Sequence, residues 1–137
     1  MKKKTIEDYL RTIYLIYEDM EDKTLGVRSV DIARSLKITK PTVSEMIKKL
    51  AKLGYINTSP YSNIFLTTKG LRKAKRLSHD YRVIGVFLNK ILKYNDLEKV
   101  DEEAHRLEHA FSKESIKRLD TFLNNPKKCP HGKIIHK

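Results

Sequence analysis

Residues 29–54 read SVDIARSLKITKPTVSEMIKKLAKLG and carry the signals of two short helices joined by a tight connection. The first helix is predicted to begin near Ser29. Its apolar positions are Val30, Ile32, Ala33 and Leu36. Pro41 has the fixed φ and the missing N–H that suit the first turn of a second helix, which Gly54 ends. This order of helix, tight turn and proline-started helix is typical of a helix-turn-helix.

The second predicted helix, from about residue 41 to 53, separates apolar from polar side chains. At about 100° per residue, its apolar face consists of Val43, Met46, Ile47 and Leu50. Its polar face consists of Thr42, Ser44, Glu45, Lys48, Lys49 and Lys52. Short hydroxyls near the helix start can approach base edges in the major groove, and the lysines can neutralise phosphates. Glu45 fits only if it accepts a hydrogen bond from a cytosine amine; otherwise it weakens this interpretation.

Two short strands are predicted after Gly54, at residues 55–58 and 64–67, with 59–63 as the connection. A helix-turn-helix followed by a β-hairpin is the layout of a winged helix, whose second helix enters the major groove. The candidate DNA contacts are Arg28, Thr39, Lys40, Pro41, Thr42, Ser44, Glu45, Lys48, Lys49, Tyr61, Ser62 and Asn63. The helix pattern alone leaves open a small helical domain with a solvated lysine face.

Further helices are predicted on both sides of this segment. One follows Thr5, a candidate N-cap, and another runs from Thr68 with apolar residues at spacings of three and four. The second is longer than a small domain needs, so we expect it to lead from a winged helix-turn-helix domain (1–72) into an all-helical domain (73–137). The candidate dimerisation residues on it are Tyr81, Ile84, Leu88 and Ile91. Two more helices, near 97–111 and 112–123, make the expected fold mostly α.

Composition limits the class of protein. Among 137 residues there are 29 Lys and Arg against 17 Asp and Glu, a net charge of +12, which favours an acidic partner such as nucleic acid. The single cysteine, Cys129, excludes an internal disulfide and suits a reducing cytoplasm. No apolar stretch approaches the roughly 20 residues of a membrane span. We therefore expect a cytoplasmic protein with no membrane partner.

A second group of residues has the spacing of metal ligands. His105, Glu108 and His109 lie at i, i+3 and i+4, so they share one side of a predicted helix. Two imidazoles and a carboxylate can chelate a divalent ion, with Asp8 as a further oxygen donor. A solvated face with two ordinary histidines is the simpler alternative. The same residues match the H-x-x-E-H pattern of zinc peptidases, but so short a chain can hardly supply the third ligand and the cleft, and we expect no enzyme.

Five segments together resemble the diphtheria toxin repressor and manganese transport regulator family of metal-responsive repressors. They are TIEDYLRTIY (5–14), PTVS (41–44), LTTKG (66–70), the stretch 101–112, and CPHG (129–132). The resemblance implies a winged-helix domain and a helical dimerisation domain. It also implies a homodimer that binds a palindromic operator, generally in genes for metal uptake, when Mn(II) or Fe(II) is bound. The length resembles that of the shorter, two-domain branch.

The family's metal ligands fall on Asp8, His105, Glu108 and His109. Independently of the family, Asp101, Cys129 and His131 are weaker candidates. The chain departs from the family at Arg11, which is a carboxylate in the manganese branch, at His105 itself, and at Tyr81 and Gly85. Without a thiolate in the main set, Zn(II) and Co(II) are acceptable besides Mn(II) and Fe(II). Cys129 and His131, with His136, form either a second site or an incidental tail. A winged-helix regulator that no longer depends on metal is the alternative function.

Overall fold

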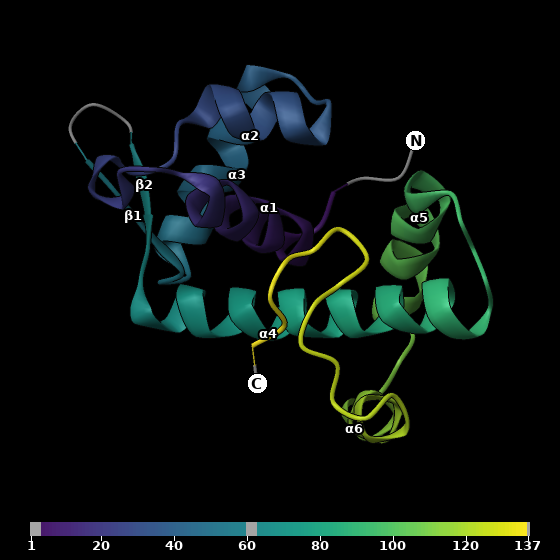
Figure 1. Ribbon diagram of the computed structural model, residues 1–137. Coiled ribbons are helices and arrows are strands. Elements are labelled where there is room, and N and C mark those ends of the chain that lie inside the picture. The colour runs from purple at the N-terminus through teal and green to yellow at the C-terminus, as the bar shows by residue number, and fades with distance from the viewer. Residues whose placement is uncertain (1–3, 60–62, 137) are drawn as a thin grey trace. The chain divides into compact units, whose positions relative to one another are not determined.

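The computed structural model of the chain describes residues 4–59 and 63–136 (Figure 1). The chain divides into an N-terminal unit, Met1–Lys75, and a C-terminal unit, Arg76–Lys137, where we expected a boundary between residues 72 and 73. No helix in the described part of the chain is both long and apolar enough to cross a membrane.

The N-terminal unit begins with helix α1, Ile6–Asp19, which starts at the predicted cap. Thr5 accepts from the backbone N–H of Asp8, and the Asp8 side chain accepts from the backbone N–H of Thr5, which completes a capping box. The buried hydrophobic side chains of α1 are Tyr9, Leu10, Ile13 and Tyr14, and the polar residues Asp8, Arg11 and Thr12 are buried beside them. These hydrophobic side chains supply a large part of the core of the unit.

The helix-turn-helix follows as α2, Ser29–Leu36, and α3, Lys40–Lys52. A short 3-10 turn, η1 (Lys23–Leu25), precedes it. Lys37, in the left-handed conformation, ends α2, and the Thr39 hydroxyl caps α3 by accepting from the backbone N–H of Thr42. Helix α2 packs against α1 and α3, and α3 buries Val43, Ile47 and Leu50. The predicted helix-turn-helix is confirmed, with boundaries within two residues of those expected.

The wing is an antiparallel pair of strands, β1 (Ile56–Thr58) and β2 (Ile64–Leu66), with Ile56 opposite Leu66. Val27 extends the sheet by exchanging two backbone hydrogen bonds of 2.8 Å with Ile64. Helix α4, Thr68–Val86, follows β2 at once. The wing is therefore anchored to the segment between η1 and α2 as well as to its own partner strand.

The C-terminal unit contains the rest of α4, its π-helical end η2 (Phe87–Ile91), α5 (Leu97–Glu108) and α6 (Lys113–Phe122). These helices surround one apolar cluster. Its buried members are Ile84, Leu88, Val100, Ala104 and Ile116. Val100 and Ala104 on α5 share one face, so they fix which side of α5 is turned toward the cluster and which side carries its polar residues.

Two of the four candidate dimerisation residues lie inside this cluster. Ile84 and Leu88 are 0% and 1% exposed because α5 and α6 cover them within the same chain, which leaves these two side chains no surface for a second copy. Tyr81 is half-buried, and its hydroxyl donates to the carbonyl of Asp101 at 3.3 Å. Ile91, 44% exposed beside the exposed Leu92, is the most accessible of the four, and its role in a dimer stays a prediction.

The segment after α6 is ordered against the C-terminal unit. Ile135 is buried with Val83 and Val86, and the buried guanidinium of Arg82 donates to the carbonyl of Ile134 at 2.9 Å. A β-bridge joins Lys128 to Ile134 and closes the tail into a loop. Residues 128–135 are therefore part of the folded unit.

Candidate metal centre and nucleic-acid interface

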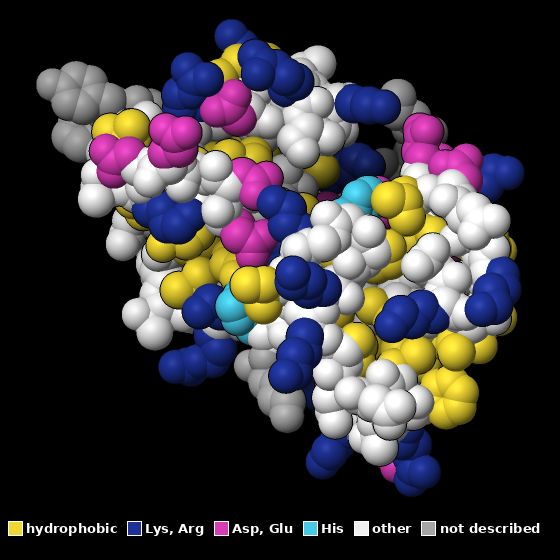
Figure 2. All heavy atoms as spheres, in the orientation of Figure 1, with side chains coloured by type: hydrophobic (Ala, Val, Ile, Leu, Met, Phe, Trp, Pro, Cys, Tyr) yellow, Lys and Arg dark blue, Asp and Glu magenta, His cyan; other side chains and the backbone are white. Residues whose placement is uncertain are grey.

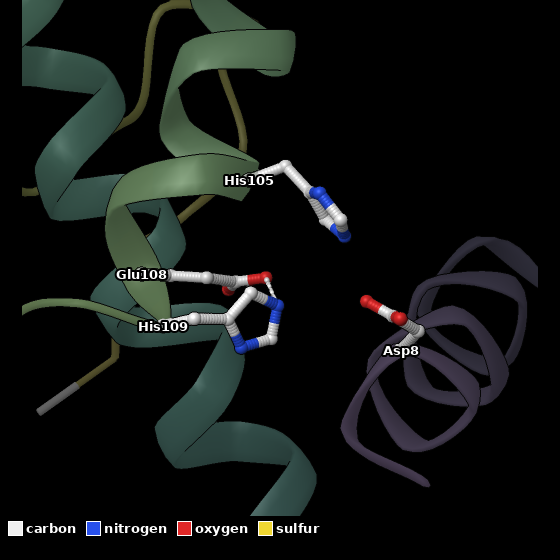
Figure 3. Close-up of side chains that lie close together, drawn as sticks. All are labelled: Asp8, His105, Glu108 and His109. Atoms are coloured by element: carbon white, nitrogen blue, oxygen red, sulfur yellow. Dashed lines mark ion pairs between the residues drawn. The ribbon is translucent and has the colours of Figure 1, made fainter. Parts of the chain in front are cut away.

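The metal-ligand candidates of the C-terminal unit lie at the end of α5. His105 and Glu108 are in its last turns, and His109 is its C-cap. One ligand atom of each lies within 4.8 Å of those of the other two. The imidazoles of His105 and His109 meet edge to face, with ring centroids 5.3 Å apart (Figure 3). The spacing i, i+3 and i+4 thus produces the convergence expected of a chelating face.

The Glu108 side chain is much more buried than that of its neighbour His109. The Glu108 side chain is 3% exposed and its Oε1 lies 3.6 Å from Nε2 of His109, whose side chain is 36% exposed. A charged carboxylate so removed from water is stable only when hydrogen bonds or a neighbouring cation compensate for the lost hydration, and a bound metal ion would do so. The set of two imidazole nitrogens and one carboxylate suits borderline divalent ions, so the residues fit the metal that their pattern predicts.

Asp8 lies in the first turn of α1 in the N-terminal unit, and its side chain is 4% exposed. Its Oδ2 accepts from the Thr5 backbone N–H at 2.8 Å and from the Thr5 hydroxyl at 3.0 Å. Its Oδ1 lies 3.8 Å from Nη2 of Arg11. Asp8 is thus a buried carboxylate with one oxygen held by the helix cap and the other near a guanidinium.

The weaker ligand candidates, Asp101, Cys129 and His131, lie apart from the end of α5 that carries His109. Nε2 of His131 lies 2.9 Å from Oδ1 of Asp101, so these two side chains pair with each other. Cys129 is half-buried beside the apolar cluster of the tail. The part of the chain that the structure describes contains one group of three or more His, Cys, Asp or Glu donors that could hold an ion. Asp101, Cys129 and His131 do not belong to it.

The predicted DNA contacts on α3 are all exposed. They are Lys40, Pro41, Thr42, Ser44, Glu45, Lys48 and Lys49. Thr39 is exposed too, but its hydroxyl caps α3 and lies 2.8 Å from that of Thr42. Arg28 pairs with Asp31 at 3.1 Å at the start of α2. The exposed face of α3 therefore carries short hydroxyls at its start and lysines at its end, and its contact with DNA stays a prediction.

Of the three predicted wing contacts, Asn63 alone lies in the described residues, and its role in DNA binding stays a prediction. Nδ2 of Asn63 donates to the carbonyl of Leu25 at 2.7 Å, so this side chain holds the wing to η1. Tyr61 and Ser62, the other two predicted wing contacts, lie outside the described residues.

Figure 2 shows one face of the molecule, on which magenta acidic side chains gather over α1 and α5 among dark blue basic ones.

Sequence reasoning missed the basic start of α4. Lys69 and Arg72 are exposed there, yet this helix was considered only as a connection and a dimer contact. The signal was present: residues 37–76 contain ten Lys and Arg and only one acid, Glu45. Counting charge by segment, and not only over the whole chain, finds it.

Two family models together match nearly the whole chain. The N-terminal DNA-binding domain of iron-dependent repressors matches residues 1–64, and their metal-binding and dimerisation domain matches residues 67–137. The chain belongs to the iron-dependent repressor family. It is accordingly a DNA-binding regulator of the metal-dependent repressor class, and this membership favours the regulator over the zinc-peptidase alternative.

Individual relatives agree with this assignment. An HTH-type transcriptional regulator of Methanocaldococcus jannaschii is 38% identical over 120 residues, which are 88% of this chain and 93% of that protein. The iron-dependent repressor IdeR of Mycobacterium leprae is 33% identical over 131 residues, 96% of this chain and 55% of IdeR. The solved structure of the manganese regulator SloR matches with a TM-score of 0.83 and 37% identity over 99% of this chain. The chain spans 61% of that SloR chain.

Proposed function

We propose that this chain represses genes for metal uptake, with Mn(II) or Fe(II) as its co-repressor. Zn(II) and Co(II) can occupy the same donors. The observation that carries the proposal is the convergence of His105, Glu108 and His109 on one side of α5, because this donor set suits a borderline divalent ion. The iron-dependent and manganese-dependent relatives support the same two metals.

We further propose that Asp8 is the fourth ligand. Its support is the family pattern at this position and a carboxylate that is almost fully buried beside a cation. Asp8 belongs to the N-terminal unit and the other three ligands to the C-terminal unit. An ion that takes all four donors would favour one arrangement of the two units, and a regulator senses metal when that arrangement binds DNA better.

The DNA partner is proposed to be a palindromic operator bound by a homodimer. A two-fold dimer presents two α3 helices to half-sites separated by about 34 Å or a multiple of it. The exposed hydroxyls of Thr42 and Ser44 would face base edges, and Lys48 and Lys49 would face phosphates. Ile91 remains as a candidate dimer contact.

Calorimetric titration of chelator-stripped protein tests the metal site. We expect Mn(II) to bind, and Fe(II) to bind when oxygen is excluded. Asp8→Ala and His109→Ala should each lower the number of ions bound per chain at this site. His136→Ala removes an exposed imidazole of the tail and serves as the control, so it should leave the titration unchanged. Metal uptake that is indifferent to both Asp8→Ala and His109→Ala would contradict the proposed ligands.

Gel-shift titration tests the coupling to DNA. The protein would select its operator from a random-sequence duplex pool in the presence of Mn(II), and binding would then be compared with and without chelator. We expect chelation to weaken operator binding at least tenfold. Equal binding in both conditions would instead support the alternative, a winged-helix regulator that does not depend on metal.

A further inference from the structure

In the part of the chain that the structure describes, the exposed basic residues of α3 and early α4 form a group that no acidic side chain pairs with. Exposed arginines of other segments form ion pairs: Arg28 and Arg34 with Asp31, Arg106 with Glu103, and Arg118 with Glu114. Within residues 4–59 and 63–136, no carboxylate pairs with Arg72 or Lys75, or with Lys48, Lys49 or Lys52. A row of cations without counter-charges is the electrostatic feature that attracts a polyanion.

The start of α4 is fixed to the end of α3 inside the N-terminal unit. Nζ of Lys69 donates to the carbonyl of Leu53, the C-cap of α3, at 2.8 Å and lies 4.6 Å from the ring centroid of Tyr55. The Thr67 hydroxyl donates to the carbonyl of Gly54 at 2.7 Å. Gly70 lies directly against the backbone of Tyr55. The basic residues of α4 therefore keep a fixed position relative to the lysines of α3.

Helix geometry places the α4 cations on one side. Gly70 and Ala74 are fully buried and define the inner face. At about 100° per residue, Lys69, Arg72 and Lys75 fall on the opposite side, and all three are exposed. No large apolar side chain between residues 68 and 75 is exposed, so this face lacks the apolar stripe that a membrane-surface helix inserts.

We propose that Arg72 and Lys75 bind phosphates of the duplex DNA that flanks the base pairs contacted by α3. The footprint of the protein would then extend past the helix-turn-helix and the wing along the DNA backbone. This inference rests on the proposed function, since it assumes that α3 binds duplex DNA. These contacts would add affinity for DNA that does not depend on the base sequence, because phosphate contacts position a protein on DNA without reading bases.

The salt dependence of DNA binding tests this inference. Each phosphate contact contributes about 0.9 to the slope of log affinity against log salt. The double variant Arg72→Gln/Lys75→Gln should therefore lower the slope by about 2 per chain, on the selected operator and on mixed-sequence duplex alike. Arg72→Lys keeps the charge and should keep the slope. The control Lys117→Gln/Arg118→Gln removes the same two charges from α6 and should leave the slope unchanged.

A second measurement uses the length of the duplex. Trimming both ends of the selected operator should weaken wild-type binding and leave the Arg72→Gln/Lys75→Gln protein almost unaffected. A double variant with the wild-type slope and the wild-type response to trimming would overturn the inference while the proposed function stands. A wild-type protein that selects no duplex at all would overturn the proposed function and this inference with it.

Discussion

Arg11 and Asp8 lie one turn apart on α1 and form an ion pair in which Nη2 of Arg11 is 3.8 Å from Oδ1 of Asp8. Both side chains are nearly buried, with exposures of 11% and 4%. The other oxygen of Asp8, Oδ2, accepts from the backbone N–H and the hydroxyl of Thr5. A metal ion that binds Asp8 therefore meets a guanidinium at the same carboxylate.

The first prediction is that Arg11→Met increases metal affinity. Like charges about 4 Å apart repel by about 1 kcal/mol in water and by about 4 kcal/mol at an effective dielectric constant of about 20, so removing the guanidinium favours the ion, and the value toward the solvent limit sets the expected size. We expect the affinity for Mn(II) to rise on the order of tenfold. The metal-free protein should lose about 1–3 kcal/mol of stability, since Asp8 keeps its burial and loses its partner. Competition with a fluorescent chelator and chemical denaturation measure the two effects.

The matched control for Arg11 is Arg106→Met. Arg106 is on α5, its side chain is 72% exposed, and it pairs with Glu103 at 3.0 Å. Its replacement changes the net charge of the protein by the same amount, yet a surface ion pair is worth little and is screened by salt. An Arg11→Met protein with unchanged metal affinity would show that Asp8 and its guanidinium neighbour take no part in holding the ion.

The second prediction concerns pH and His79. Nδ1 of His79 lies 2.9 Å from Oδ1 of Asp80, and Nε2 lies 3.3 Å from Oδ2 of Asp120 on α6. The hydrogen bond to Asp80, together with the charges of Asp80 and Asp120, raises the pKa of His79 above its ordinary value of 6.5, although burial opposes the rise. The folded state therefore favours the imidazolium, which links α4 to α6.

The raised pKa of His79 decides how its contribution to stability changes with pH. Stability contributed by His79 is fully present below pH 6.5, the pKa of the unfolded chain, and is lost as pH rises through the higher pKa of the folded state. His79→Gln should lower the free energy of unfolding by about 1–3 kcal/mol at pH 6 and by less at pH 8. Urea denaturation of chelator-treated protein at both pH values measures the difference. An equal loss at the two values would contradict an imidazolium in the folded protein.

The third prediction separates a structural from a DNA-binding role for Asn63. Because its side chain donates to the carbonyl of Leu25, Asn63→Ala should cost about 1 kcal/mol of stability. The slope of DNA binding against salt should stay at the wild-type value, since no cation is removed. A variant of unchanged stability with weakened DNA binding would return Asn63 to the predicted set of DNA contacts.

Local signals were sufficient for the helix-turn-helix. The capping residues Thr5 and Thr39, the proline at 41 and the glycine at 54 each act within one turn of the chain, so their effect can be read from neighbouring residues. The face of α5 with His105 and His109 was predictable for the same reason, because helical spacing alone decides which side chains converge.

Long-range packing explains what the sequence did not predict. Ile84 and Leu88 have the spacing of a dimer stripe, but the same spacing serves burial under α5 and α6, and periodicity cannot distinguish the two partners. Asn63 was assigned to DNA because a wing tip is polar, whereas its partner Leu25 lies 38 positions away. Asp101 pairs with His131 across 30 positions for a similar reason.

The last prediction compares two glycines of α4. A Cβ on Gly70 would lie 2.0 Å from the backbone oxygen of Tyr55, which cannot move aside, whereas a Cβ on Gly85 would make ordinary contacts of 3.5 Å or more with Pro130 and Val100. Gly70→Ala should therefore cost on the order of 3 kcal/mol by forcing α4 away from the end of α3. Gly85→Ala should be neutral or stabilising by up to about 1 kcal/mol, since alanine favours a helix.

Thermal and urea denaturation of both glycine variants checks the contrast, and equal stabilities would show that α4 does not pack on Tyr55 this closely. Because Gly70 fixes the basic start of α4 beside α3, Gly70→Ala should also lower the salt slope of DNA binding, which Gly85→Ala should not.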